Sequence, residues 1–201
     1  MLRVGLTGGI ACGKSTVVAI LRELGCLVLE ADPLAHRVQQ PGQPAYEEVL
    51  REFGRGILAA DGAIDRKKLG PIVFADPAKR GRLNQIVHPH VIAAQEAQLD
   101  AWERERADLG IIEAPLLIEA GYHARMDRVV VVWCTRGQQM ARLLARGMSP
   151  ADAFQRIAAQ MPVEEKRRLA QDSIDCSGTM EHTRAQTEAL VARLRKGPSR
   201  R

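Results

Sequence analysis

The chain has 201 residues, enough for one well-buried domain with at most a small inserted subdomain. Its formal net charge of +5 favours anionic partners, but an aromatic content of 3% leaves few rings for stacking the bases of single-stranded nucleic acid. The four cysteines form no CxxC pair and the longest apolar run, residues 129–134, is too short to cross a bilayer, so we expect a cytoplasmic protein that binds neither nucleic acid nor membrane.

Short apolar strands alternate with helical segments along the chain. Alternating apolar residues over 2–6 predict a first strand, and apolar residues at helical spacing over 17–24 predict a helix that Gly25 ends. Thr179 is the predicted N-cap of a final helix. Four further strands are predicted over residues 26–30, 109–113, 128–134 and 173–178. This alternation predicts an α/β fold with a five-stranded parallel sheet.

Two long segments interrupt the alternation. Residues 33–105, the insertion, carry helical patterning with few strand signals, and a long insertion in an α/β core commonly covers a substrate. Residues 137–166, the flap, are polar, rich in arginine and broken by Pro150 and Pro162, which favours a lid over the site. We expect a single domain over residues 1–201 that carries both segments.

The stretch GLTGGIACGKST, residues 5–16, contains a complete phosphate-loop motif. Residues 8–15, the phosphate loop, fit the pattern GxxxxGK[ST] and lie after a predicted strand and before a predicted helix. The glycines let N–H groups turn toward phosphate oxygens, the lysine reaches the β- and γ-phosphates, and the hydroxyl binds Mg²⁺. A glycine-rich turn with a chance lysine is the alternative, but it does not explain this setting. The predicted nucleotide-binding residues are Gly8, Gly9, Ala11, Cys12, Gly13, Lys14, Ser15 and Thr16.

Two carboxylates stand where predicted strands end. Ligands of open α/β sheets bind beyond the carboxyl ends of the strands, so Asp32 and Glu113 are expected to face the phosphate loop. Asp32 can orient or deprotonate an attacking hydroxyl, or it is only a helix N-cap, since Pro33 suits the first helical position. Glu113 has the position of a carboxylate that supports Mg²⁺, or it caps the turn that follows.

The flap carries the arginines that phosphoryl transfer needs. Arg142 and Arg146 are four residues apart and share a helix face, and Arg156 follows them. Such side chains can close over phosphates, and a solvated basic helix face is the alternative for each of them.

The cysteine of the phosphate loop has surroundings that favour a reactive thiol. Cys12 lies beside Lys14 and a helix N-terminus, which lower the pKa of a thiol, so we expect alkylation of Cys12 to block ATP binding. The histidines show no metal-ligand grouping, which favours structural or substrate-contacting roles for His36, His88 and His90.

Together these stretches resemble the dephospho-CoA kinase family, which finishes coenzyme A synthesis. GLTGGIACGKS is similar to the family's opening loop, and EADPLAHRVQQPG to its DAD-x-x-A-H segment after the second strand. IDRKKLGPIVFADP and LNQIVHPHV resemble its coenzyme-binding insertion, and APLLIEAGY its PLL-x-E segment. QMARLLAR and AFQRIAAQ resemble its flap, and SIDCSG its last strand.

The resemblance implies a P-loop NTPase-type three-layer fold and an ATP-dependent transfer of phosphate to the ribose 3′-hydroxyl of dephospho-CoA, giving CoA and ADP. ATP is then the co-substrate, Mg²⁺ the cofactor, the insertion the coenzyme-binding part, and the enzyme a monomer. The implied catalytic residues are Lys14, Asp32 and Arg142, of which Arg142 also contacts the nucleotide. The implied substrate contacts are Thr7, Asp32, His88 and Leu116, and the implied Mg²⁺ ligands are Ser15 and Glu113.

Three residues depart from the family pattern. Glu30 and Glu113 stand where the family usually has aspartate, which keeps the charge and lengthens the side chain. Cys176 replaces a usual asparagine near the nucleotide, which removes any adenine contact of that amide but not the reaction.

Three other classes compete with this interpretation. A kinase for another acceptor, such as a nucleoside or nucleoside monophosphate, shares the loop, but the insertion favours dephospho-CoA. A GTPase-like switch needs an N-K-x-D segment, which the sequence lacks, and its DxxG match at residues 175–178 falls at the far end of the fold. A nucleic-acid-binding ATPase would show a steep loss of RNA binding with added salt.

Overall fold

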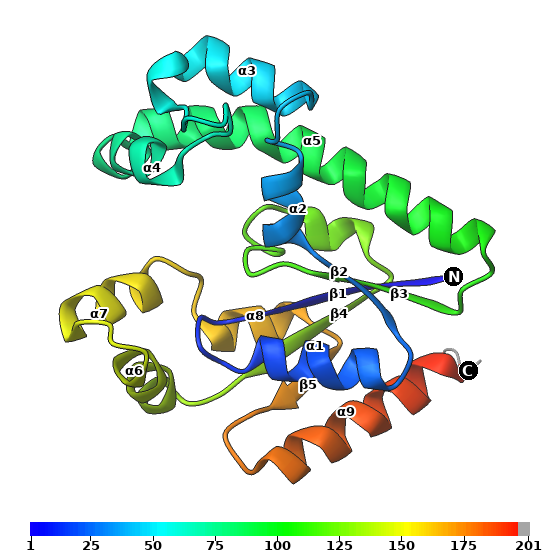
Figure 1. The fold of residues 1–201 in the computed structure, drawn as a ribbon. Helices are drawn as coiled ribbons and strands as arrows, with labels where there is room; N and C mark the ends of the chain where they lie inside the picture. The colour runs from blue at the N-terminus through cyan, green and yellow to red at the C-terminus, as the bar shows by residue number, and fades with distance from the viewer. Residues whose placement is uncertain (197–201) are drawn as a thin grey trace. The chain divides into compact units, whose positions relative to one another are not determined.

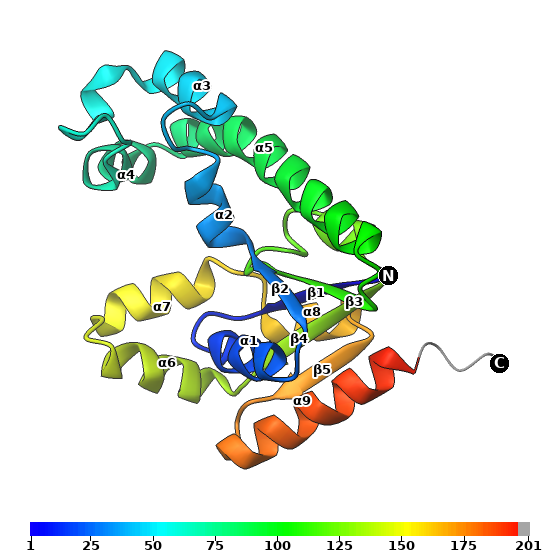
Figure 2. The ribbon, with the colours of Figure 1, turned by 45° about the vertical axis from the view of Figure 1, so that its right-hand side comes forward.

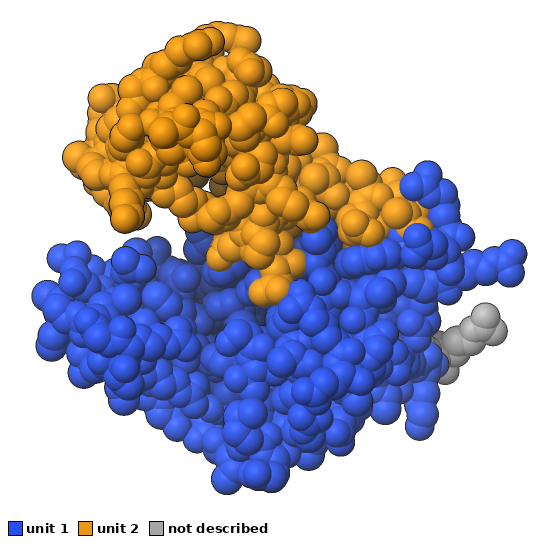
Figure 3. Space-filling model, in the orientation of Figure 1, with its two compact units in different colours: residues 1–29, 102–201 blue, residues 30–101 orange. Residues whose placement is uncertain are grey.

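The structure is a computed structural model that describes residues 1–196. It contains two compact units (Figure 3): the first unit joins Met1–Leu29 to the chain from Trp102 onward, and the second unit is Glu30–Ala101. The bounds of the second unit differ by a few residues from those expected for the insertion, residues 33–105. What the insertion does stays a prediction.

A five-stranded sheet forms the centre of the first unit (Figure 1). In sheet order, the strands are β2 (Leu27–Glu30), β3 (Leu109–Glu113), β1 (Leu2–Gly8), β4 (Arg128–Trp133) and β5 (Asp172–Asp175). β1 pairs in parallel with both β3 and β4, and β4 pairs in parallel with β5. The expected α/β fold with a parallel sheet is confirmed, and the strand that leads into the phosphate loop is central.

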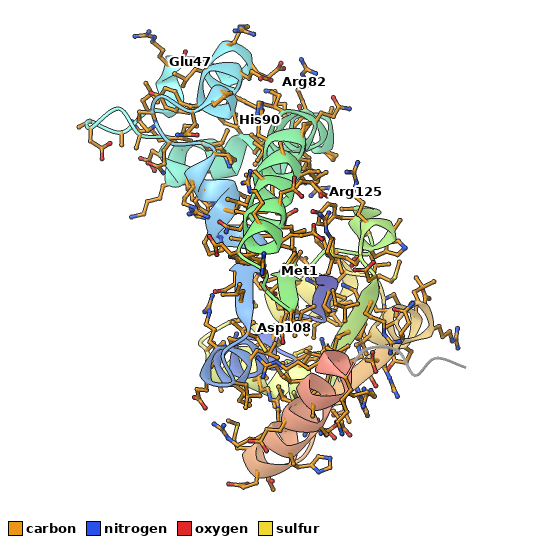
Figure 4. All side chains as sticks on the ribbon, turned by 90° about the vertical axis from the view of Figure 1, so that its right-hand side faces the viewer. Met1, Glu47, Arg82, His90, Asp108 and Arg125 are labelled. Atoms are coloured by element: carbon orange, nitrogen blue, oxygen red, sulfur yellow. The ribbon has the colours of Figure 1, made fainter. Side chains whose placement is uncertain are left out.

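The amino-terminal edge of the sheet shows how the parallel strands begin. Met1 and Asp108 lie at this edge (Figure 4), where the N–H of Leu2 donates to the Asp108 carbonyl at 3.0 Å. At the opposite end of the sheet, the short strand and turn predicted over residues 173–178 are confirmed, and β5 ends at Asp175. The chain leaves the sheet after Asp175, whose carboxylate accepts the N–H of Ser177 at 2.8 Å and so forms a turn.

Helices cover both faces of the sheet and make three layers. On one face α1 (Lys14–Glu23) and α9 (Met180–Arg195) lie side by side (Figures 1 and 2) over a core of alternate strand residues. That core includes Val4, Leu6, Ile111, Val130, Val132 and Ile174. Gly5 and Thr7 alternate with these residues and point to the other face, where α8 (Val163–Leu169) packs against β4. The predicted N-cap of α9 is confirmed, since the Thr179 side chain accepts the N–H of His182.

The flap consists of helices whose ends are set by local side chains. α6 (Arg136–Ala145) begins with a capping box in which Thr135 and Gln138 bond to each other's backbone. Ser149 caps α7 (Pro150–Ala158) by accepting the N–H of Asp152. The two prolines of the flap start helices: Pro150 is the first residue of α7, and Pro162 is the N-cap of α8. α6 and α7 lie at the carboxyl end of β1 (Figures 1 and 2).

The second unit is helical, as the patterning of residues 33–105 predicts. It contains α2 (Ala31–Arg37), α3 (Pro44–Phe53), a short helix at Arg55–Ile57, α4 (Arg66–Ala75) and most of α5 (Pro77–Arg104). His90 of α5 (Figure 4) bonds to Glu48 of α3 at 2.9 Å and joins the two helices. A second short helix, Tyr122–Arg125, lies in the first unit. Among the described residues, no helix is both long and apolar enough to cross a membrane.

Candidate active site

The phosphate loop curls between β1 and α1, as its motif predicts. Gly8 has φ +156° and Gly13, the N-cap of α1, has φ +100°. A Cβ atom on Gly8 would collide with the carbonyl oxygen of Val132 on the neighbouring strand. Ala11 also has a positive φ, +58°, which side-chain-bearing residues rarely adopt. The loop backbone is therefore held in a special conformation, of the kind that turns successive N–H groups inward.

Cationic side chains bond to the carbonyl oxygens of the loop. The Nζ atom of Lys14 donates to Gly8 at 3.2 Å and to Gly9 at 3.3 Å, and Nη1 of Arg142 donates to Ala11 at 3.1 Å. In a trans peptide the C=O and N–H point in opposite directions, so these bonds set the directions of the N–H groups of Gly9, Ile10 and Cys12. Within residues 1–196 the N–H groups of Ala11 and Gly13 have no hydrogen-bond partner. They are donors for an anion that binds in the loop.

Of the three flap arginines, Arg142 is the one held at the loop. Its Nη2 atom also donates to the carbonyl of Cys176 at 2.7 Å, so the guanidinium joins the loop to the end of β5. Arg146 is the exposed C-cap of α6, and Arg156 is exposed on α7. The tertiary structure thus distinguishes Arg142 from the other two flap arginines, because Arg142 bonds to the phosphate loop.

The predicted Mg²⁺ ligands are a hydroxyl and a carboxylate on separate elements. Ser15 is exposed in the first turn of α1. Glu113 is the last residue of β3, is only 6% exposed, and pairs in register with Leu6. No group of three or more acidic, histidine or cysteine side chains in the described part of the chain could hold a metal. This sparse donor set fits Mg²⁺, which keeps waters and takes phosphate oxygens as ligands.

Asp32 lies in the second unit, in the first turn of α2. The alternative role as N-cap is wrong, because Glu30 occupies the N-cap position and Asp32 is the second helical residue. Its side chain is exposed. Four residues on, burial and then the charge of Arg66 lower the pKa of His36, while Asp32 acts in the opposite direction. This helix face therefore favours a neutral His36 beside the Asp32 carboxyl group.

Two expectations about buried side chains need correction. Thr7 is 0% exposed and its hydroxyl donates to the Pro115 carbonyl at 3.2 Å, so its side chain supports the loop after β3 and cannot reach a substrate. Cys12 is also 0% exposed, which removes the expected ready alkylation. Leu116, in contrast, is 47% exposed, and His88 is exposed on α5.

Three cysteines gather around the phosphate loop, a grouping that the sequence did not predict. The Cys134 thiol approaches the Cys12 sulfur at 3.7 Å; this contact lowers the pKa of Cys12 to about 7 and raises that of Cys134. Cys176 packs against the loop, since a Cβ atom on Gly13 would lie 3.2 Å from its sulfur. Burial raises the pKa of Cys176. The departure at Cys176 therefore fills space behind the loop with a neutral thiol.

A buried lysine joins the flap to the segment after β3, and the sequence reasoning missed it. Lys166 of α8 is 0% exposed, forms an ion pair with Glu119 at 2.8 Å and donates to the Pro115 carbonyl at 2.7 Å. Glu119 also accepts the N–H of Met161 at 3.2 Å. The helical spacing could have indicated its burial, because Lys166 lies three residues after the buried Val163 on the same helix face.

We expect Lys166→Ala to lower the free energy of unfolding by about 3 kcal/mol, because it leaves the Glu119 charge without its buried partner. Urea unfolding followed by circular dichroism measures the change. Arg168→Ala, an exposed residue of the same helix, is the matched control and should shift stability by less than about 0.5 kcal/mol. Equal stabilities of the two variants would contradict the structural role of Lys166.

The fold and the loop together define a P-loop kinase. The fold class agrees with that of shikimate kinase from Acinetobacter baumannii, whose structure has a TM-score of 0.54 over 99% of this chain and 96% of that chain. At 15% sequence identity that likeness shows the fold alone.

The family model of dephospho-CoA kinase matches residues 2–182, and the chain belongs to this family, which carries out the final step of coenzyme A biosynthesis. A dephospho-CoA kinase from Symbiobacterium thermophilum is 49% identical over 92% of this chain and 78% of that protein. A dephospho-CoA kinase from Geobacter sulfurreducens is 47% identical over 94% of this chain and 97% of that protein. The structure of dephospho-CoA kinase from Campylobacter jejuni has a TM-score of 0.76 at 27% identity, covering 98% of each chain.

Proposed function

We propose that this chain transfers the γ-phosphoryl group of ATP to the ribose 3′-hydroxyl of dephospho-CoA, giving CoA and ADP. The observation that supports this most directly is the phosphate loop, in which Lys14 and Arg142 anchor carbonyl oxygens while the N–H groups of Ala11 and Gly13 stay open. Such a loop binds the phosphates of a nucleotide, and membership of the family identifies the acceptor.

The residues of the phosphate loop stabilise the negative charge that develops during phosphoryl transfer. The hydroxyl attacks in line, and negative charge develops on the oxygens of the transferred group and of the leaving ADP. Lys14 and Arg142 place positive charge beside the loop, and the N-terminus of α1 adds the positive end of its dipole. Ser15 and Glu113 would hold Mg²⁺ beside the loop, and the ion would supply positive charge to the nucleotide phosphates when bound.

Asp32 acts on the acceptor. Its exposed carboxylate orients the attacking hydroxyl and accepts its proton as the new bond forms. The second unit, Glu30–Ala101, then supplies the binding surface for the coenzyme, with His88 as a contact. Leu116 of the first unit stays a predicted substrate contact. We further infer that the chain acts in the cytoplasm, since its four cysteines are free thiols, and we propose that it is a monomer.

A coupled assay of ADP release tests the acceptor. We expect turnover with ATP and dephospho-CoA at least about 100-fold above that with adenosine, AMP or no acceptor, because a truncated acceptor loses the binding contacts that position the attacking hydroxyl. Mass spectrometry of the product checks that one phosphate has been added. Comparable rates with AMP or adenosine would indicate a different small-molecule kinase.

A further inference from the structure

The two peptide groups that flank Ile10 in the phosphate loop are each held by a glutamine of the flap. Oε1 of Gln160 accepts the N–H of Ile10 at 2.7 Å, and Nε2 of Gln139 donates to the carbonyl of Ile10 at 2.8 Å. Gln139 lies on α6 and is 6% exposed, whereas Gln160 lies in the turn between α7 and α8. The two glutamines come from different parts of the flap, α6 and the turn after α7, and meet at a single loop residue.

The bond from Gln139 fixes the direction of a neighbouring donor. The carbonyl of Ile10 and the N–H of Ala11 belong to the same trans peptide and point in opposite directions. Holding the oxygen on the Gln139 side therefore holds the Ala11 N–H on the other side, where it has no partner within the described residues. The same peptide precedes the unusual positive φ of Ala11, so the bond also stabilises a backbone conformation that an alanine disfavours.

Apolar contacts join the same elements. Ala11 packs with Leu143 of α6 and Ala153 of α7 in one small core, and Ile10 and Ile157 pack against it. The loop thus lies on the flap helices through side chains as well as through the two glutamine bonds. A change in the flap at either glutamine should reach the loop backbone.

We propose that Gln139 and Gln160 are positioning residues of the phosphate loop: Gln139 orients the Ile10–Ala11 peptide so that the Ala11 N–H meets the nucleotide phosphates, and Gln160 holds the preceding Gly9–Ile10 peptide. The inference rests on the proposed function of the loop as a nucleotide site. The two residues set how tightly the nucleotide binds and contribute no contact to the acceptor.

Two glutamate substitutions separate hydrogen bonding from charge. Gln160→Glu and Gln139→Glu add the same charge beside the same loop residue, Ile10. A carboxylate keeps the acceptor that the Ile10 N–H needs but lacks the donor that the Ile10 carbonyl needs. We expect Gln139→Glu to raise the Kd for ADP and the KM for ATP at least about fivefold above the values of Gln160→Glu. The KM for dephospho-CoA should stay within about twofold of wild type in both.

Control variants test whether the substitutions disturb folding. Gly9, Gln139 and Gln160 line a cavity of about 210 Å³, which gives water access to the Ile10 peptide when a glutamine is replaced. Gln155→Glu, on an exposed position of α7, is the matched control and should leave all constants and the Tm unchanged. If Gln139→Glu lowers the Tm, the uncharged Gln139→Met should raise the same two constants without that loss.

Equal constants for Gln139→Glu and Gln160→Glu, or a rise confined to the KM for dephospho-CoA, would overturn the proposal. Calorimetric titration with ADP measures nucleotide binding whatever the acceptor is. A wild-type protein that binds ADP but does not phosphorylate dephospho-CoA would therefore refute the proposed function without refuting the positioning role.

Discussion

Asp32→Asn is expected to lower kcat by about 10²–10⁴-fold while leaving the Kd for ATP within about threefold of wild type. The amide keeps the size of the side chain but accepts a proton far less readily, so the attacking hydroxyl loses its base. Nucleotide binding is spared because the side chains that hold the phosphate loop, Lys14, Gln139 and Arg142, all belong to the first unit, and Asp32 lies in the second.

Steady-state kinetics with both substrates and a binding titration with ATP measure the two effects separately. Glu47→Gln, which removes one exposed carboxylate of the same unit (Figure 4), is the matched control and should keep wild-type kcat. Near-native turnover of Asp32→Asn would rule out the catalytic role of Asp32. A loss of turnover that comes with a large loss of ATP binding would instead assign Asp32 to the nucleotide site.

Lys14→Ala is expected to lower kcat by about 10²–10³-fold and also to weaken ATP binding, in contrast to Asp32→Asn. Lys14 bonds to the carbonyl oxygens of Gly8 and Gly9 and supplies a positive charge at the phosphate loop. Its removal therefore affects both the ground state and the transition state. Lys14→Arg should not restore turnover, because a planar guanidinium does not replace a compact ammonium group.

ADP titration and single-turnover rates measure the two losses in Lys14→Ala. Lys196→Ala, an exposed lysine after α9 in the same unit, serves as the control for a lost positive charge. Wild-type affinity for ATP combined with wild-type turnover in Lys14→Ala would refute the assignment of residues 8–15 as the nucleotide site.

The sheet and the phosphate loop could be predicted from the sequence because each follows from a pattern of residues that are close together in the chain. Period-two apolar residues mark a strand, and the fixed spacing of Gly8, Gly13, Lys14 and Ser15 marks the loop. Burial of the apolar strands then requires helices on both faces, which gives the layered fold. The observed strands differ from the predicted ones only at their ends. β5, for example, ends at Asp175, whose carboxylate accepts the N–H of Ser177 in the turn that follows.

The contacts between residues of different helices and strands could be read only from the tertiary structure. Thr7 and Cys12 belong to recognisable motifs, but their burial depends on the Pro115 carbonyl and on Cys134, which come from other elements. The family resemblance implies a role for Arg142, but the helical spacing alone does not distinguish it from Arg146; its bond to the loop carbonyl of Ala11 does.

The sequence by itself therefore determined the phosphate loop, the parallel α/β sheet and the family resemblance. Only the tertiary structure decided which side chains hold the loop in its conformation. Gln160 and Ile10 are separated by 150 positions, and Gln139 and Ile10 by 129, yet both pairs form hydrogen bonds. A local pattern cannot encode such pairs, because their distance is fixed only when the sheet brings the end of β4 and the flap beside the end of β1.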